Sequence, residues 1–106
     1  MKSWFISFAL FFFSFAHAAC FEEAAQRYQI PVELLKAIST VESNGNAGAI
    51  NTNKNGSVDY GHMQINDWWL PKLEPYGITK DKLVEPCINT NVGAWILGSP
   101  RFQCNK

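Results

Sequence analysis

The sequence predicts a mainly α-helical domain with a small β-hairpin, an α+β fold, and three segments carry this prediction. Residues 31–42 and 86–97 each repeat apolar side chains at the three- and four-residue spacing of an amphipathic helix. Between them, a polar stretch contains Asn55-Gly56, a strong short-range signal for a tight hairpin turn. Helices on both sides of a short hairpin indicate one small domain.

The first two helices are expected at 21–28 and 31–42. Pro31 suits the first position of the second helix, because its missing N–H is not needed there. Asn44 and Gly45 follow the helix and accept the left-handed conformation that ends it. The residues expected to face the core are Ala24, Ala25 and Tyr28 in the first helix, and Leu34, Leu35, Ile38 and Val41 in the second.

The later segments are shorter, apart from the last helix. Two strands near 49–51 and 57–64 should pair around the hairpin turn. After the hairpin we expect a short helix around 68–73 capped by Asp67, a turn at 74–77, and a turn to Leu83 capped by Thr79. A helix over 86–97 follows, opened by Pro86. Its expected core-facing residues are Ile88, Val92, Trp95 and Ile96.

Residues 1–18 predict a secretory signal peptide rather than part of the fold. Lys2 gives a positive start, 4–15 is apolar, and 16–18 has the Ala-x-Ala pattern of a cleavage site. The alternatives are an uncleaved anchor, although this run is short against the roughly 20 residues of a membrane span, or a lipoprotein acylated at Cys20. We therefore expect a periplasmic domain over 19–97, with no membrane span after cleavage.

Charge and cysteine content restrict the partners. The chain has 9 basic and 9 acidic residues and no polybasic patch, which argues against a nucleic-acid partner. No C-x-x-C or H-x-x-x-H spacing occurs, so we expect neither metal nor cofactor. Cys20, Cys87 and Cys104 allow three disulfide pairings in an exported chain, each leaving one thiol over.

Glu42 is the candidate catalytic residue. It follows Ile38 by four residues and Leu35 by seven, so its carboxylate should lie along the apolar face at the helix end. Partial desolvation and the negative end of the helix dipole would both favour the protonated form. A glutamate kept protonated near neutral pH is what a general acid needs. The alternative is a helix-end side chain that bends into water.

The residues after Glu42 favour the catalytic interpretation. Glu-Ser-Asn at 42–44 ends a helix, a polar hairpin follows, and Gly-His-Met-Gln-Ile-Asn at 61–66 precedes Trp68. This order resembles the catalytic half of the lytic transglycosylases, the lysozyme-like family that cleaves peptidoglycan. It is most similar to the small members associated with type III secretion, conjugation and type IV pilus systems. The resemblance continues through 86–97 and covers roughly 20–97.

The resemblance implies a lysozyme-like fold with a cleft, and a single catalytic carboxylate. Glu42 would protonate the oxygen of the β-1,4 bond between N-acetylmuramic acid and N-acetylglucosamine. It would then take the proton of the sugar's own C6 hydroxyl, which closes a 1,6-anhydro ring. The alternative enzyme is a lysozyme-type hydrolase with Asp59 as second carboxylate, although Asp59 also fits a solvated hairpin position.

The resemblance also implies a set of substrate-binding residues. Gln64, which can both donate and accept hydrogen bonds, would lie in the cleft with Met63, for which core packing is an equal alternative. Gly61 would let the backbone approach the substrate, Ser43 would position the reacting sugar, and Tyr60 could stack on a sugar face. The expected substrate-binding residues are Ser43, Tyr60, Gly61, Met63 and Gln64.

Trp68, Trp69 and His62 have more than one interpretation. Adjacent tryptophans in a helix cannot share one face, so one of the two should be in the core and the other free to stack on sugars. His62 stands where the family often has an apolar residue. We expect it at an exposed strand position rather than as a catalytic base.

The resemblance implies a Cys20–Cys87 disulfide and ends after Leu97. The segment 98–106 lacks the Ala-Tyr-Asn motif that family members carry in later helices, so we expect a truncated domain with apolar surface exposed on Ile88, Val92 and Ile96. The remaining alternative function is an inactive remnant that only binds glycan or a partner in a secretion, conjugation or pilus apparatus.

Overall fold

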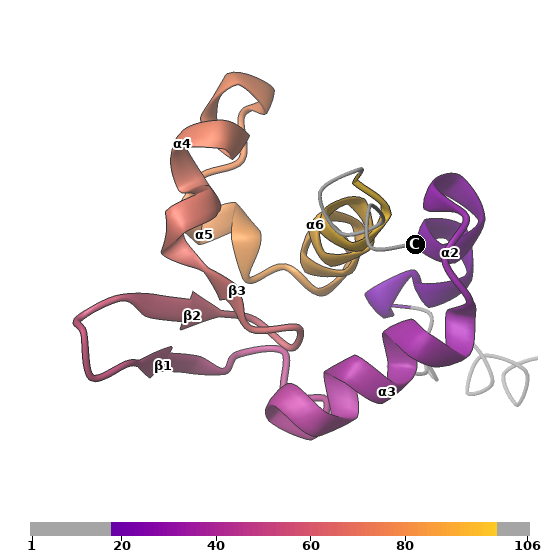
Figure 1. Cartoon of the computed structure of the whole chain (residues 1–106), viewed down its shortest axis with the longest axis horizontal. Helices are drawn as coiled ribbons and strands as arrows, with labels where there is room; N and C mark the ends of the chain where they lie inside the picture. The colour runs from indigo at the N-terminus through magenta and orange to yellow at the C-terminus, as the bar shows by residue number, and fades with distance from the viewer. Residues whose placement is uncertain (1–17, 100–106) are drawn as a thin grey trace, which may run out of the picture.

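A computed structural model describes residues 18–99 of the chain. Three longer helices, α2 (Phe21–Tyr28), α3 (Val32–Ser43) and α6 (Pro86–Gly98), lie together on one side. A small antiparallel sheet extends from them on the other side, and short helical turns lie between the sheet and α6 (Figure 1). The mainly helical, lysozyme-like α+β prediction is confirmed.

Helices α2 and α3 begin and end close to the predicted residues. Asn44 ends α3 in the left-handed conformation, with φ of 55°. The predicted core stripe of α3 is partly wrong, because Leu34 is 44% and Val41 81% exposed, whereas Leu35 is fully buried. The buried face of α3 runs instead from Leu35 to Ser39, which lie one turn apart on the side that packs against the rest of the domain.

The sheet has three strands, not the two that the sequence predicts. Strands β1 (Ile50–Thr52), β2 (Val58–Tyr60) and β3 (Ile65–Asn66) pair in the order β1-β2-β3. The expected continuous strand over 57–64 is wrong. Gly61 and Gln64 have φ of 80° and 53°, and this pair of left-handed residues reverses the chain and starts β3.

Short helical turns connect the sheet to α6. They are η2 (Asp67–Trp69), α4 (Leu70–Leu73), η3 (Glu74–Tyr76) and α5 (Lys80–Leu83). Asp67 does not cap the turn that it opens, because the side chain of Asn66 accepts the N–H of Trp68 and takes that role. The Asp67 carboxylate accepts the N–H of Val58 at 3.1 Å instead, which ties it to β2. Thr79 stands at the N-cap of α5, but its side chain makes no capping bond.

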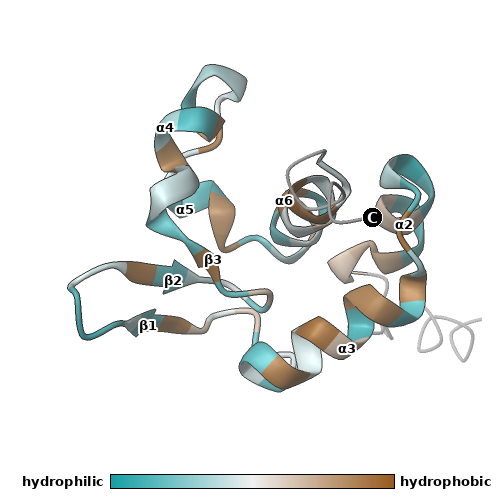
Figure 2. Ribbon diagram, in the orientation of Figure 1, coloured by the Kyte–Doolittle hydropathy of each residue, from teal (hydrophilic) through white to brown (hydrophobic). Residues whose placement is uncertain are grey.

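Helix α6 packs against α2 and, through its other side, against the turn between β2 and β3. Figure 2 shows apolar residues along α3 and on parts of α6, while α2 is largely hydrophilic on the side in view and the tip of the β1–β2 hairpin is hydrophilic. Val92 is 4% exposed, so its expected exposure is wrong. Ile88, Trp95 and Ile96 are half-buried. The core residues are Ala19, Phe21, Ala24, Ala25, Leu35, Met63, Ile65, Leu73, Leu83, Val92 and Ala94.

A disulfide joins Cys20 to Cys87 with their Cα atoms 5.0 Å apart, which confirms the pairing that the resemblance implies. It ties the start of α2 to the first turn of α6 across 67 residues of chain. A loop of this length corresponds to about 4 kcal/mol of stabilisation in the chain-entropy model. The third cysteine, Cys104, and the predicted signal peptide up to residue 17 lie outside the described residues. Within 18–99, no helix has the length and apolar character needed to cross a membrane.

Candidate functional site

A cavity of about 220 Å³ lies between α3, the turn between β2 and β3, and α6. Apolar side chains and amides share its wall, a mixture that suits a sugar with apolar faces and polar edges. The lining includes Ile38 of α3, Met63 and Gln64 of the turn, Trp69 of η2, and Gly93 and Leu97 of α6. The cavity therefore brings together two of the predicted substrate-binding residues, Met63 and Gln64.

Asn89 of α6 holds the turn that forms one wall of this cavity. Its amide donates to the carbonyls of Tyr60 at 2.9 Å and Leu83 at 2.8 Å, and its side-chain oxygen accepts the N–H of Met63 at 2.8 Å. Asn89 is fully buried, so these three bonds replace the water that each group loses. Sequence reasoning missed this role, although an asparagine in the middle of an apolar helix was a visible signal.

Gly61 packs directly against Asn89. It is buried, and a Cβ added there would collide with the Asn89 amide. Its φ of 80° is also unfavourable for other residue types. The structure thus gives Gly61 a packing role, and an approach of glycan to its backbone stays a prediction.

Gln64 lines the cavity with an amide that the protein already orients. Asn51 of β1 donates to its side-chain oxygen at 2.9 Å, and its own amide donates to the carbonyl of Gly61 at 3.0 Å. The oxygen keeps a second lone pair that can accept a bond from a ligand. The β1 strand and the turn thus fix the orientation of Gln64.

Glu42 lies in the last turn of α3, one turn beyond the cavity residue Ile38. Its side chain is exposed, so the expected partial desolvation by the protein is wrong. At 100° per residue Glu42 lies about 20° from the buried Leu35 around the helix. The last turn, however, opens to solvent beside Val41. Within residues 18–99, no group donates a hydrogen bond to this carboxylate.

Ser43, beside Glu42, joins the end of α3 to the turn. Its hydroxyl donates to the carbonyl of His62 at 2.8 Å and accepts the N–H of Asn46 at 3.0 Å. Both bonds lie within the protein and give Ser43 a structural role, while its contact with the reacting sugar stays a prediction. Through Ser43, Glu42 is placed next to the turn that carries Gln64.

His62 is fully buried, which makes its expected exposed position wrong. Its Nδ1 lies 2.7 Å from the hydroxyl of Ser39, and its Nε2 lies 2.7 Å from the hydroxyl of Thr90 and 3.2 Å from the carbonyl of Pro86. Burial lowers the pKa of His62, and the hydrogen bond to Pro86 opposes this shift in part. The turn folds back at Gly61, which directs His62 inward rather than along a strand.

Asp59 is held by amides of the hairpin. Its two carboxylate oxygens accept bonds from Asn66 at 2.8 Å and from Asn53 at 3.2 Å. Asp59 also faces Asn51 in the strand register of β1 and β2. This carboxylate stabilises the sheet and differs in this respect from Glu42.

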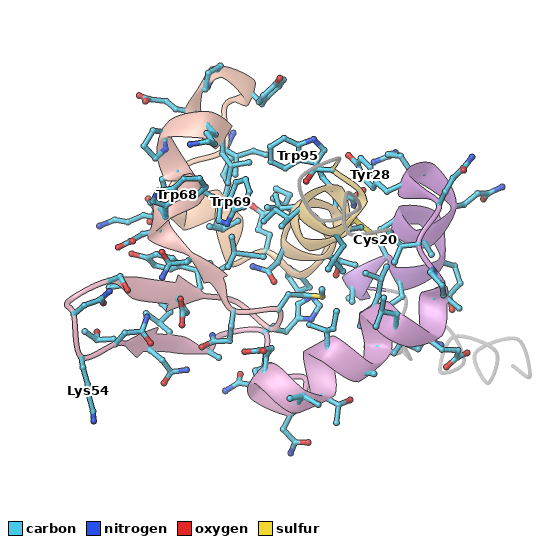
Figure 3. All side chains as sticks on the ribbon, viewed as in Figure 1. Cys20, Tyr28, Lys54, Trp68, Trp69 and Trp95 are labelled. Carbon is cyan, nitrogen blue, oxygen red and sulfur yellow. A yellow bond between two sulfur atoms is a disulfide. The ribbon has the colours of Figure 1, made fainter. Side chains whose placement is uncertain are left out.

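The aromatic residues divide as the helix geometry predicts. Trp69 is half-buried and packs edge-to-face against Trp95 of α6, with ring centroids 5.8 Å apart (Figure 3). Trp68 is 51% exposed, and the amine of Lys72 lies 3.8 Å from its ring centroid. Tyr60 is half-buried and packs against the core. Trp69 is therefore the tryptophan that reaches the cavity.

A second cavity of about 420 Å³ lies between α2, the region of η3 and α6. Its lining is mostly apolar and includes Tyr28, Tyr76, Ile88, Val92 and Trp95. None of the predicted catalytic or substrate-binding residues lines it, whereas Cys87 of the disulfide does. Among residues 18–99, no three His, Cys, Asp or Glu side chains come close enough to hold a metal ion.

Comparison with known proteins places this arrangement in a family. A family model described as the transglycosylase SLT domain matches residues 19–106. The chain belongs to the SLT transglycosylase domain family. The match includes α2, α3, the sheet and α6, and so contains every residue of the cavity described above.

Curated relatives of this SLT domain come from enteric bacteria. The chain is 44% identical to Protein IpgF of Shigella flexneri over 81 residues, which are 76% of the chain and 53% of IpgF. It is 43% identical to Invasion protein IagB of Salmonella typhimurium strain LT2 over 83 residues, 77% of the chain and 52% of IagB. It is 41% identical to a peptidoglycan-binding-like protein of Escherichia coli O157:H7 over 99 residues, 86% of the chain and 59% of that protein. The chain thus spans about half the length of these relatives.

Proposed function

We propose that this SLT domain cleaves the glycan strands of peptidoglycan as a lytic transglycosylase, with Glu42 as the acid and then the base. The observation that carries the proposal is the contrast between two carboxylates. Asp59 is bound by the amides of Asn53 and Asn66. Glu42 does not line the cavity, but it is exposed one helical turn beyond Ile38, which does. A mechanism with one carboxylate fits this arrangement better than one that needs two.

In the proposed reaction, the Glu42 carboxyl donates its proton to the glycosidic oxygen as the bond from C1 of the N-acetylmuramic acid residue breaks. The resulting carboxylate then accepts the proton of the C6 hydroxyl of the same sugar. That hydroxyl oxygen bonds to C1 and closes the 1,6-anhydro ring. The glutamate ends the cycle protonated, and no water enters the products.

The residues that line the cavity would bind and orient the glycan. The exposed carboxyl of Glu42 needs a low-water environment to act as an acid near neutral pH, and a bound glycan strand would exclude water from it. Trp69 offers an apolar ring beside the oriented amide of Gln64, a combination that suits the face and the N-acetyl group of a sugar. Met63, which is 5% exposed, shapes the floor of the cavity.

We further propose that the domain acts in the periplasm, where it opens the wall locally for a secretion, conjugation or pilus apparatus. The predicted signal peptide supports the compartment. The names of two relatives, an invasion protein and a peptidoglycan-binding-like protein, support a role at the cell envelope. An assembled apparatus must pass through the wall, and a small lytic domain would supply the gap.

Product analysis tests the proposed reaction. The exported chain is incubated with purified peptidoglycan sacculi, and the released fragments are identified by mass spectrometry. We expect fragments with 1,6-anhydro ends, lighter by one water than hydrolysis products. Fragments with free reducing ends would identify a hydrolase and overturn the single-carboxylate mechanism. Glycan binding without released fragments would identify a binding domain.

A further inference from the structure

His62 lies where four parts of the domain meet, and the proposed reaction gives its side chain no role. Ser39 approaches it from α3, Pro86 and Thr90 from α6, and the ring of Phe21 from the start of α2, at 5.6 Å between centroids. The imidazole is 0% exposed. A titratable ring in such a position affects every element that it contacts when its charge changes.

The partners of the ring assign its protons. The carbonyl of Pro86 can only accept, and the hydroxyl of Thr90 donates to that same carbonyl at 2.9 Å. Thr90 therefore accepts from His62, and Nε2 carries the hydrogen. Nδ1 then accepts the hydroxyl hydrogen of Ser39 at 2.7 Å. These hydrogen bonds match the neutral ring with its hydrogen on Nε2.

A second proton would reverse one hydrogen bond of this network. It would sit on Nδ1 and donate to the hydroxyl oxygen of Ser39, so the Ser39 hydroxyl could no longer donate to the ring. The groups that these elements present to the ring are uncharged: two hydroxyls, a carbonyl and the Phe21 ring. The acidic residues near them in the sequence, Glu22, Glu42 and Glu85, are exposed. The lowered pKa of His62 agrees with this environment.

His62 also joins α3 to the turn over 61–64, the two segments that carry the candidate site residues. The carbonyl of His62 accepts the hydroxyl of Ser43 at 2.8 Å, and its ring accepts that of Ser39, one turn earlier in α3. Glu42 precedes Ser43, and Gln64 lies two residues after His62. Two bonds from one residue thus join the last two turns of α3 to the turn that lines the cavity.

We propose that neutral His62 is a positioning residue that holds Glu42 beside the Gln64 turn, and that protonation of its ring releases this connection and switches the site off in acid. The statement about activity depends on the proposed function. The statement about the connection between α3 and the turn does not, and it can be measured without substrate.

The sign of the pH effect follows from the lowered pKa of the folded state. Below the ordinary imidazole value of about 6.5, the unfolded chain takes up a proton that the folded chain still excludes. The contribution of His62 to stability is therefore complete above that value. It declines as the pH falls toward the lowered pKa of the folded state, and it does not decline further below that pKa.

The first test measures the connection in the full chain. Nitrogen chemical shifts of the imidazole report its tautomer and its pKa, and amide hydrogen exchange at 62–64 and at Ser43 reports the contact. We expect Nε2–H in the neutral ring. Protection at these amides should drop as the ring is protonated, while protection in α2 changes less. A hydrogen on Nδ1, an ordinary pKa, or unchanged protection would overturn the proposal.

The second test uses variants and a pH profile. His62→Gln keeps an N–H donor without a titrating ring, so protection at 62–64 should become independent of pH between about 4.5 and 7.5, around the ordinary imidazole pKa. If lytic activity is found, its decline in acid should shift to lower pH in this variant.

Leu73→Ala, a core change away from the ring, should lower stability and leave the pH profile unchanged. If His62→Gln does not fold, Thr90→Val takes its place. This variant removes one acceptor of the Nε2–H of His62, so amide exchange at 62–64 that is linked to protonation of the ring should increase. Equal pH dependence in all variants would overturn the proposal.

Discussion

The two sides of the cavity are built in opposite ways. The turn over 61–64 is buried, and its backbone and side-chain groups are paired with Asn89, Ser39 and Thr90. The last turn of α3 is open, with Val41 81% exposed and Glu42 exposed beside it. The side that would bind substrate is thus held rigidly, whereas the side that would react depends on a ligand to exclude water. The difference separates the hydrogen-bonded residues of the turn, which form the wall of the cavity, from Glu42, which would carry out the reaction.

The largest effect is expected at the open side. Glu42→Gln keeps the shape of the side chain but cannot donate a catalytic proton, so release of glycan fragments should fall by about 100-fold or more. Because Glu42 is exposed, the melting temperature should hardly change. Glu33→Gln, the same change in the first turn of α3, is the matched control and should keep full activity. Loss of activity together with loss of folding would show that Glu42 has a structural role.

The next effect is expected at the fixed side. Asn89→Ala leaves two carbonyls and one N–H buried without a partner, so we expect a loss of about 3 kcal/mol in the free energy of unfolding. Urea unfolding of the full chain measures this loss. Asn91→Ala in the same helix removes an amide whose contacts with Arg27 and Cys87 lie nearer the surface. It should cost less than about 1 kcal/mol. Equal costs would contradict the central role given to Asn89.

The smallest effect concerns the second carboxylate. Asp59→Asn weakens two hairpin hydrogen bonds but leaves the cavity intact, so activity should fall by less than about threefold, the equivalent of one weakened hydrogen bond. Initial rates of fragment release, measured beside those of Glu42→Gln, make the comparison. A loss at Asp59 as large as that at Glu42 would favour the hydrolase over the transglycosylase.

Local patterns predicted the helices and part of the site. The bounds of α2 and α6 follow from periodicity and from Pro86, and the left-handed end of α3 follows from Asn44. The partner of Cys20 came only from the family resemblance, because three cysteines alone allow three pairings. Propensity and spacing reflect the local conformational preference of each residue. They predicted the bounds of these helices because those bounds depend on local preference.

The interior of the site could not be predicted in the same way. His62 follows a strand pattern, yet it is buried because the chain reverses at Gly61 and Gln64. That reversal is stabilised by Asn89, which lies 28 residues after Gly61 in the sequence. Exposure of Val41 likewise depends on which elements cover α3, and helical periodicity does not contain that information.

The contact between Gly61 and Asn89 has a consequence for how this sequence can change over generations. Any side chain at 61 meets the amide at 89, and removal of that amide strands three backbone groups in the core. Replacement of either residue by itself should make the protein less stable, so an amino-acid change at either codon is expected to be selected against. At 61 a paired change at 89 would relieve the collision but not the strain of the left-handed backbone. Exposed surface residues such as Lys54, at the hairpin tip, remain free to vary one at a time.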